Sequence, residues 1–144
     1  MTHVDKGKYF KKHPEGTKVA EELKQEILKQ TKDNNISCKA AEKISQSRNT
    51  PLGEIGVAID MLNINIAQCQ LGLFGFAGKQ KRVPAAESVT SELEAAIRGA
   101  LVDNRLSCTD AWKIADQLDV KRLDVCAACE KLKIKVKPCQ LGAF

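Results

Sequence analysis

The chain has 144 residues, of which 43% are hydrophobic and 28% are charged, and its formal net charge is +5. This composition is typical of a globular protein and excludes the disordered and fibrous classes. No apolar run approaches the roughly 18 residues of a membrane span, and residues 1–12 are polar, without the apolar core of a signal peptide. We therefore expect a cytoplasmic protein with no membrane partner, in which the six cysteines are free thiols rather than disulfides.

A tandem repeat organises the chain. A shift of 70 residues aligns positions 19–74 with positions 89–144 without a gap, and about a third of the aligned positions are identical. The run Cys69-Gln70-Leu71-Gly72 returns as Cys139-Gln140-Leu141-Gly142. Self-similarity of this extent indicates two copies of one small domain.

The repeat divides the chain into four parts. They are a basic arm (1–18), repeat 1 (19–74), a basic linker (75–88) and repeat 2 (89–144), with formal charges of +3, −1, +2 and +1. The positive excess lies mainly in the arm and the linker, which favours a polyanionic partner for those parts. Each repeat is so small that its core would be marginal alone, so we expect the two to pack together.

Each repeat begins with two predicted helices. Val19, Leu23 and Ile27 recur at four-residue spacing, as do their counterparts in repeat 2, and this spacing indicates an amphipathic helix. A second helix is expected to begin after Ser37 in repeat 1 and after Ser107 in repeat 2. Both serines are good N-cap residues, because a serine hydroxyl accepts a hydrogen bond from the first helical turn.

A third helix is predicted to follow a tight turn. The turn falls at Asn49 in repeat 1 and at Asp119 in repeat 2, and both residue types tolerate a left-handed backbone. In repeat 1 we expect Thr50 to cap the third helix and Pro51 to occupy its first turn. Apolar and polar residues alternate after this helix, over positions 64–66 and 134–136, which predicts a short strand.

The order helix, helix, tight turn, helix, strand is that of a winged helix-turn-helix domain. The segment from Ala111 to Val125, AWKIADQLDVKRLDV, carries the similarity together with Leu132 and Ile134. It resembles the helix-turn-helix core of winged-helix transcription regulators over about 25 residues per repeat, with Asp119 where that pattern usually has glycine. The resemblance implies a mainly α fold with short strands, built from two winged-helix-like units packed together, and a role in DNA binding.

In such a domain the third helix would enter the major groove, where basic side chains meet bases and phosphates. Repeat 2 supplies basic residues on this helix, at alternate positions of the strand that follows it, and in the linker. The candidate DNA-binding residues are Lys121, Arg122, Lys131, Lys133, Lys135, Lys137, Lys79, Lys81 and Arg82. The strand lysines would point to one side and could rest on phosphates, or they could form a solvated edge that discourages aggregation.

Repeat 1 is a poorer candidate for DNA contact. The matching positions are Pro51, Leu52, Glu54, Val57 and Asp60, which are apolar or acidic. A helix that presents Glu54 and Asp60 would be repelled by phosphates, whereas Gly53 and Gly56 would allow close approach of another surface. Repeat 1 is therefore a candidate site for a protein partner, and a protein-interaction module without DNA binding is the alternative function of the whole chain.

The cysteines and the single tryptophan are better explained as core residues than as parts of a metal or redox site. Cys126 and Cys129 form a CxxC motif, but they align with Gly56 and Ile59, which favours a place in the core. The repeated cysteines are expected to be buried thiols, with a four-sulfur metal site as the weaker alternative. The candidate ligands are Cys38, Cys69, Cys108 and Cys139. Trp112 is expected to be extra core, or else a contact with a partner or with the other repeat.

We expect no enzymatic activity and no cofactor. The only histidines, His3 and His13, lie in the arm. The sequence contains no glycine-rich phosphate loop, no clustered carboxylates and no nucleophile beside a base.

Overall fold

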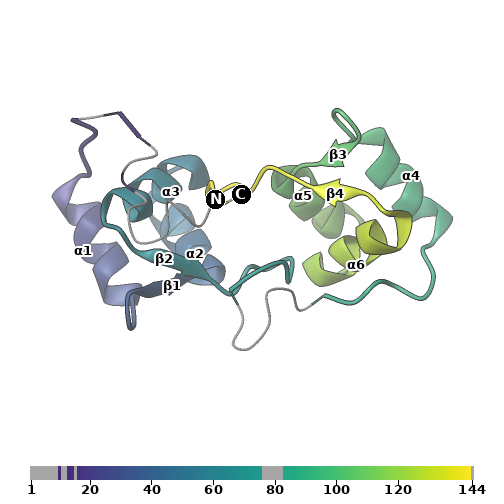
Figure 1. The fold of residues 1–144 in the computed structure, drawn as a ribbon, viewed down its shortest axis with the longest axis horizontal. Helices are drawn as coiled ribbons and strands as arrows, with labels where there is room; N and C mark the ends of the chain where they lie inside the picture. The colour runs from purple at the N-terminus through teal and green to yellow at the C-terminus, as the bar shows by residue number, and fades with distance from the viewer. Residues whose placement is uncertain (1–9, 11–12, 15, 76–82, 144) are drawn as a thin grey trace. The chain divides into compact units, whose positions relative to one another are not determined.

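The computed structural model describes residues 10, 13, 14, 16–75 and 83–143. Within them the chain is mainly α-helical with short strands, as the sequence predicts, and Figure 1 shows the order of the elements. The first elements are α1 (Glu21–Gln30), β1 (Asn35–Ser37), α2 (Cys38–Arg48), α3 (Leu52–Met61) and β2 (Asn65–Ala67). The others are α4 (Ser91–Gly99), β3 (Arg105–Leu106), α5 (Cys108–Leu118), α6 (Arg122–Leu132) and β4 (Lys135–Val136). Across these ranges no helix combines the length and the apolarity that crossing a bilayer requires.

The residues form two compact units whose limits differ from those of the repeats. Unit 1 holds the described residues up to Cys69 together with Leu141–Ala143, and unit 2 holds those from Gln70 to Gln140. The main body of each repeat thus lies in one unit, but the segment that ends the repeat is assigned to the other unit. The expected boundary at residue 74 therefore does not separate the compact units.

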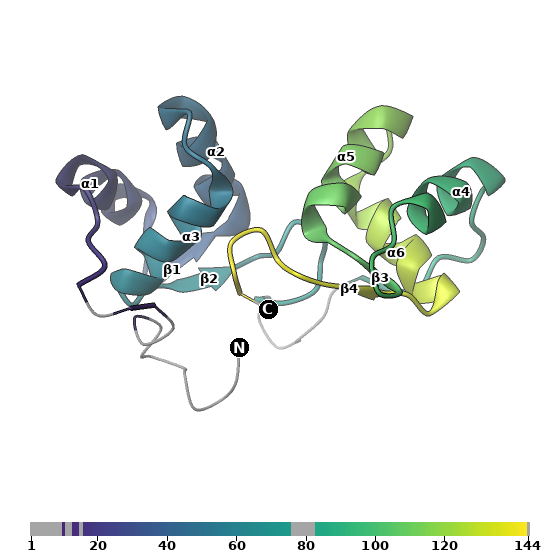
Figure 2. The ribbon, with the colours of Figure 1, turned by 90° about the horizontal axis from the view of Figure 1, so that it is seen from above.

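Each unit contains a pair of parallel strands. β1 pairs with β2 and β3 pairs with β4, with Ile36 opposite Ile66 and Leu106 opposite Val136. Figure 2 shows that within each unit the helices lie to one side of this strand pair. The strand between the first and second helices was not predicted, because two or three residues are too few for alternation to show. No β-hairpin follows α3 or α6 in the described ranges, and membership of the winged-helix family stays a prediction.

The predicted caps and turns of the second helices are confirmed. The hydroxyls of Ser37 and Ser107 each accept a hydrogen bond from the backbone N–H three residues on, at 3.0 and 3.1 Å. Asn49 and Asp119 end α2 and α5 in the left-handed conformation, with φ of 49° and 53°. A polar residue that tolerates this conformation lets the chain reverse directly into the third helix.

The predicted start of α3 is wrong by one residue. Pro51, not Thr50, is the N-cap, and no side chain caps the helix. The Thr50 hydroxyl donates instead to the carbonyl of Arg48 at 3.2 Å. The Pro51 carbonyl accepts from the N–H of Ile55, so proline stands just before the first turn rather than inside it. Its missing N–H costs nothing at that position.

The cores of the two units are built from equivalent positions of the repeat. The largest of the fully buried side chains at equivalent positions are Ile27 and Ile97, Ile36 and Leu106, Ile55 and Val125, and Ile59 and Cys129. Each large apolar side chain contributes about 1.5–3 kcal/mol when it is fully buried. The apolar stripe of the first helix and the inward side of the third helix thus meet in each unit, as their spacing predicts.

Candidate nucleic-acid interface

Four basic side chains are exposed at the strand pair of unit 2. We call Arg105, Lys133, Lys135 and Lys137 the cationic face. Arg105 and Lys135 are direct partners in the β3–β4 register. The next pair of the register, Leu106 and Val136, is only 0% and 8% exposed. Because successive residues of a strand point to opposite sides, the apolar pair packs inward and the basic pair faces out.

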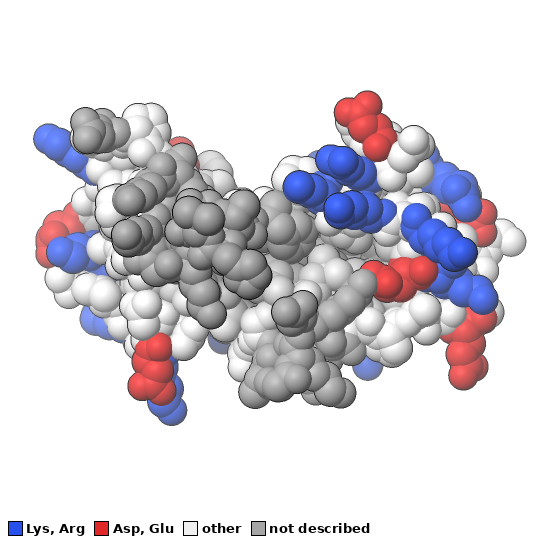
Figure 3. Space-filling model, viewed as in Figure 1, with Lys and Arg blue, Asp and Glu red and all other residues white. Residues whose placement is uncertain are grey.

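The backbone around β4 arranges the lysines in two ways. Lys137 donates its N–H to the carbonyl of Leu106 at 2.8 Å, which continues the ladder past the strand, so Lys135 and Lys137 share one side. Lys133 has a φ of 59° and ends α6 as its left-handed cap. The predicted alternation of three lysines therefore holds for two of them, and Lys133 joins the face from the helix end. Figure 3 shows lysine and arginine side chains gathered over this part of unit 2.

Unit 1 has the same strand pair without the charge. Asn35 and Asn65 are partners in the β1–β2 register, at the positions of Arg105 and Lys135. The Asn65 amide donates to the Asn35 side-chain oxygen at 2.7 Å. Asn63, with a φ of 61°, stands where repeat 2 has Lys133. Unit 1 is therefore an internal control with similar backbone geometry and neutral side chains.

The candidates on α6 lie in different surroundings. Lys121 and Lys131 are exposed near opposite ends of the helix. Arg122 is half-buried, and its guanidinium lies 3.7 Å from the centre of the Trp112 ring. It also donates to the Gln70 side-chain oxygen at 2.7 Å. Arg122 is thus held by contacts within unit 2, and a contact with a base would require it to leave them.

A segment of unit 2 also runs along the outer side of α6. A Cβ on Gly72 would lie 2.6 Å from Cδ2 of Leu123, so the backbone of Gly72 passes close to this helix. The Gly72 carbonyl accepts from the N–H of Val83, and the N–H of Ala86 donates to the carbonyl of Ala127 at 3.0 Å. In a helix-turn-helix domain the outer side of the third helix reads the bases. Here the chain itself covers part of that side.

Asp60 corrects the interpretation of repeat 1. Its carboxylate was expected to face outward and repel phosphates, but the residue is only 3% exposed. An Asp60 carboxylate oxygen lies 2.8 Å from Nε2 of His13 in the arm. A buried carboxylate needs such a partner, because desolvation without one is costly. Glu54 is exposed, as expected, while Leu52 and Val57 are half-exposed.

Gly56 makes the close approach that the sequence predicts, but the surface it meets belongs to the same chain. A Cβ at this position would collide with the carbonyl oxygen of Leu141. Both residues belong to unit 1. Gly53, one turn earlier in α3, has open space around its missing Cβ. Gly56 therefore serves internal packing rather than the protein partner expected there.

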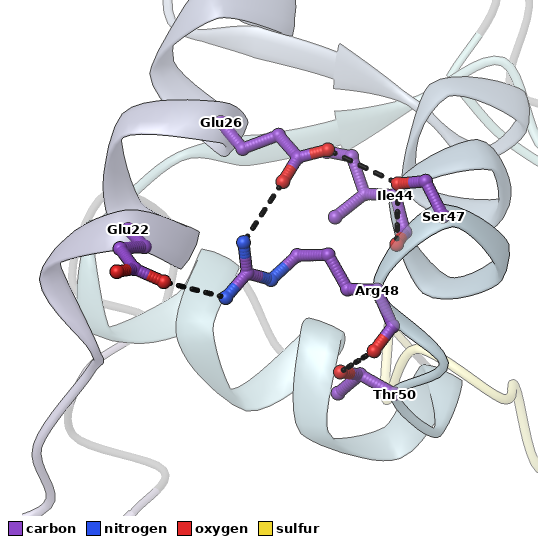
Figure 4. A network of polar contacts seen from close by, with 6 residues as sticks. All are labelled: Glu22, Glu26, Ile44, Ser47, Arg48 and Thr50. Atoms are coloured by element: carbon purple, nitrogen blue, oxygen red, sulfur yellow. Dashed lines mark hydrogen bonds and ion pairs between the residues drawn. The ribbon is translucent and has the colours of Figure 1, made fainter.

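The basic side chain of Arg48 in unit 1 is used internally. Its guanidinium approaches Glu26 at 3.2 Å and Glu22 at 3.7 Å, and the Ser47 hydroxyl donates to Glu26 at 3.1 Å. Figure 4 shows that these contacts join α1 to α2, while Ser47 and Thr50 also bond backbone carbonyls. Repeat 2 has Leu118 at the position of Arg48. The two units thus use charge differently, since Arg48 pairs inside its unit while the cationic face is exposed.

Trp112 and five of the six cysteines lie in the core as expected, whereas Cys139, which was expected to be buried as well, is half-buried. Trp112 is 8% exposed, and its Nε1–H has no hydrogen-bond partner among the described residues. All six cysteines lie within the described residues and none of them forms a disulfide there, and all but Cys139 are buried. Burial, with a smaller contribution from Glu130, raises the pKa of Cys129 to about 11.

The cysteines considered as metal ligands are Cys38, Cys69, Cys108 and Cys139. In unit 2 the Gln140 amide lies 3.5 Å from the Cys108 sulfur. Within the ranges that the structure covers, no three histidine, cysteine or acidic side chains come together as a metal site would require.

The linker candidates for DNA contact cannot be placed in the structure, whereas one further basic residue, Arg105, can. Lys79, Lys81 and Arg82 lie outside the described residues. Arg105 joins the cationic face but was not predicted, because β3 spans only two residues. Its alignment with Asn35, beside the matched turns Asp33-Asn34 and Asp103-Asn104, is the signal that marks the position.

Comparisons with protein-family models, curated proteins and solved structures return no match for this chain.

Proposed function

We propose that the protein binds duplex DNA through the cationic face of unit 2 and contacts phosphates rather than base edges. The observation that carries this proposal is the placement of Arg105 beside Lys135, with Lys137 continuing the row on an exposed strand pair. No acidic residue interrupts positions 131–137. Positive charges that are exposed side by side repel one another, and binding to a polyanion lowers their electrostatic free energy.

Recognition is expected to depend little on sequence. Arg122, the residue of α6 best suited to guanine, is engaged with Trp112 and Gln70. Because phosphate contacts position a protein without reading bases, the cationic face would hold duplexes of different sequence about equally. The arm and the linker would add further non-specific attraction through their excess of lysine and arginine.

A protein-interaction module is the second candidate. The observation that favours it is the neutral strand pair of unit 1, where Asn35 and Asn65 are bonded to one another. Such a surface offers no attraction to phosphates. If unit 1 has a partner, that partner is an uncharged protein surface.

Titration of labelled duplexes of two unrelated sequences, at salt concentrations of about 50 and 200 mM, tests the first candidate. If the four basic residues each neutralise one phosphate, they contribute about −3.6 to the slope of log K against log salt. Alanine at Lys133, Lys135 and Lys137 should reduce the slope by about 2.7 and weaken binding to both duplexes alike. The matched control removes three exposed lysines of unit 1, Lys29, Lys39 and Lys43, and should leave most of the affinity.

Three results separate the candidates. Absence of binding at low salt contradicts DNA binding and leaves the protein-interaction module. Equal losses in the two triple variants would mean that net charge, not the cationic face, attracts DNA. A loss confined to Lys121→Ala plus Arg122→Ala, with preference for one duplex, would instead show base reading by α6.

A further inference from the structure

The segments that end the two repeats are exchanged between the compact units. Leu71 belongs to unit 2 although repeat 1 supplies it, and Leu141 belongs to unit 1 although repeat 2 supplies it. Both leucines are buried, at 0% and 2% exposure. The glycines that follow them, Gly72 and Gly142, have the same left-handed φ of 78°. A short segment of the same sequence, with its glycine in the same left-handed conformation, therefore docks each time on the body of the other repeat.

In unit 1 the docked segment meets α3. The backbone of Leu141 occupies the space beside Gly56, where any side chain would collide with it. This approach is possible only because Gly56 has no Cβ. Burial of the leucine side chain contributes about 1.5–3 kcal/mol. The segment is therefore part of the core of unit 1, although its covalent connection runs to unit 2.

In unit 2 the equivalent segment meets α6. Gln70 accepts a hydrogen bond from Arg122 at 2.7 Å, and Gly72 lies against Leu123. The Gly72 carbonyl also accepts from the N–H of Val83. Docking thus uses non-covalent contacts within unit 2, and none of these contacts requires the segment and the receiving body to belong to the same copy of the chain.

We propose that a second copy of this chain can supply the segment, so that two copies exchange Leu141–Ala143 between their first units. The contacts in such a dimer are the same as those in a single chain. Only the connection differs, which is the condition under which an element is swapped between protomers at low cost. The balance between the two forms is then set by the protein concentration against the effective concentration of the segment within its own chain, which for linked binding partners is of the order of millimolar.

Refolding at two concentrations tests the exchange. The full chain is unfolded in denaturant and refolded at about 5 μM and at about 1 mM, the second being near the effective concentration of a short tether. Its mass is then measured at once by size-exclusion chromatography with light scattering. We expect the 15.8 kDa chain at the low concentration and an added species of twice that mass at the high concentration.

Two variants assign the dimer to this contact. Gly56→Val fills the space that Leu141 occupies, and Leu141→Asp places a charge in the core, so each should abolish the species of double mass. Gly53→Val is the matched control on the same helix, because among the described residues no atom from outside this helix turn lies within 4 Å of its added Cβ, and it should keep that species. A single-chain mass at both concentrations would overturn the proposal. A dimer that persists in both Gly56→Val and Leu141→Asp would overturn it as well.

Discussion

Arg105 and Lys135 lie directly opposite one another in the β3–β4 pair, where unit 1 places Asn35 opposite Asn65. Like charges at such a position destabilise a sheet, whereas the two asparagines share a hydrogen bond of 2.7 Å. The cationic face therefore lowers the stability of unit 2 while no anion is bound. A local conflict of this kind is expected at a binding surface rather than at a purely structural one.

Replacing Arg105 and Lys135 by asparagine, the pair found in unit 1, should stabilise the protein. The relief of repulsion is about 0.2–1 kcal/mol at low salt. The gain should shrink as salt is added, because the screening length falls from about 30 Å at 0.01 M to about 3 Å at 1 M. Urea unfolding at these two salt concentrations measures the effect. If the asparagine variant is no more stable than the parent at low salt, Arg105 and Lys135 do not destabilise unit 2 by repulsion.

Arg122→Ala should destabilise unit 2. The substitution removes the contact with the Trp112 ring and the hydrogen bond to Gln70, together worth about 1–3 kcal/mol. Because Trp112 is the only tryptophan, its fluorescence reports both the altered surroundings and the unfolding transition. Arg98→Ala is the control, since the pair that Arg98 forms with Glu94 is exposed and its loss should change stability by no more than about 0.5 kcal/mol.

The ion pair between Glu26 and Arg48 should be replaceable by the apolar residues of repeat 2. Arg48→Ala alone leaves Glu26 without this cationic partner and should cost up to about 1 kcal/mol. Glu26→Ala combined with Arg48→Leu, which introduces the residues at 96 and 118, should recover most of that loss. A double-mutant cycle built from Glu26→Ala, Arg48→Leu and the double variant gives the coupling from their unfolding free energies. A double variant less stable than both single variants would mean that the charges are needed for the packing of α1 on α2.

Cys129 should make the protein less stable at alkaline pH. Burial raises the pKa of its thiol from 9.0 to about 11, so between these values the folded state holds a proton that the unfolded state has lost. The free energy of unfolding therefore falls as pH rises through this window, by up to about 1.4 kcal/mol for each unit of pKa. Unfolding of the parent and of Cys129→Ala at several pH values isolates the contribution. The same alkaline slope in both proteins would assign it to other groups.

The sequence alone determined the features that depend on neighbouring residues. Ser37, Ser107, Asn49 and Asp119 were correctly placed at helix ends, because a cap or a left-handed turn needs only the local chain and a suitable side chain. The mainly helical class and the buried stripe with Ile27 followed from helical spacing. The duplication was visible for the same reason, since an ungapped repeat preserves every local pattern at once.

Only the tertiary structure decided which side chains remain available for binding. Arg122 is a candidate for DNA contact by sequence, but Trp112 on the preceding helix and Gln70, which is 52 residues away, hold it within unit 2. Asp60 was expected outside and is buried beside His13. The pairing of Arg105 with Lys135 joins two strands separated by two helices, so no local pattern reports it. Local propensity is encoded over a few residues, whereas exposure and charge neighbourhood are set by packing between segments far apart in the chain.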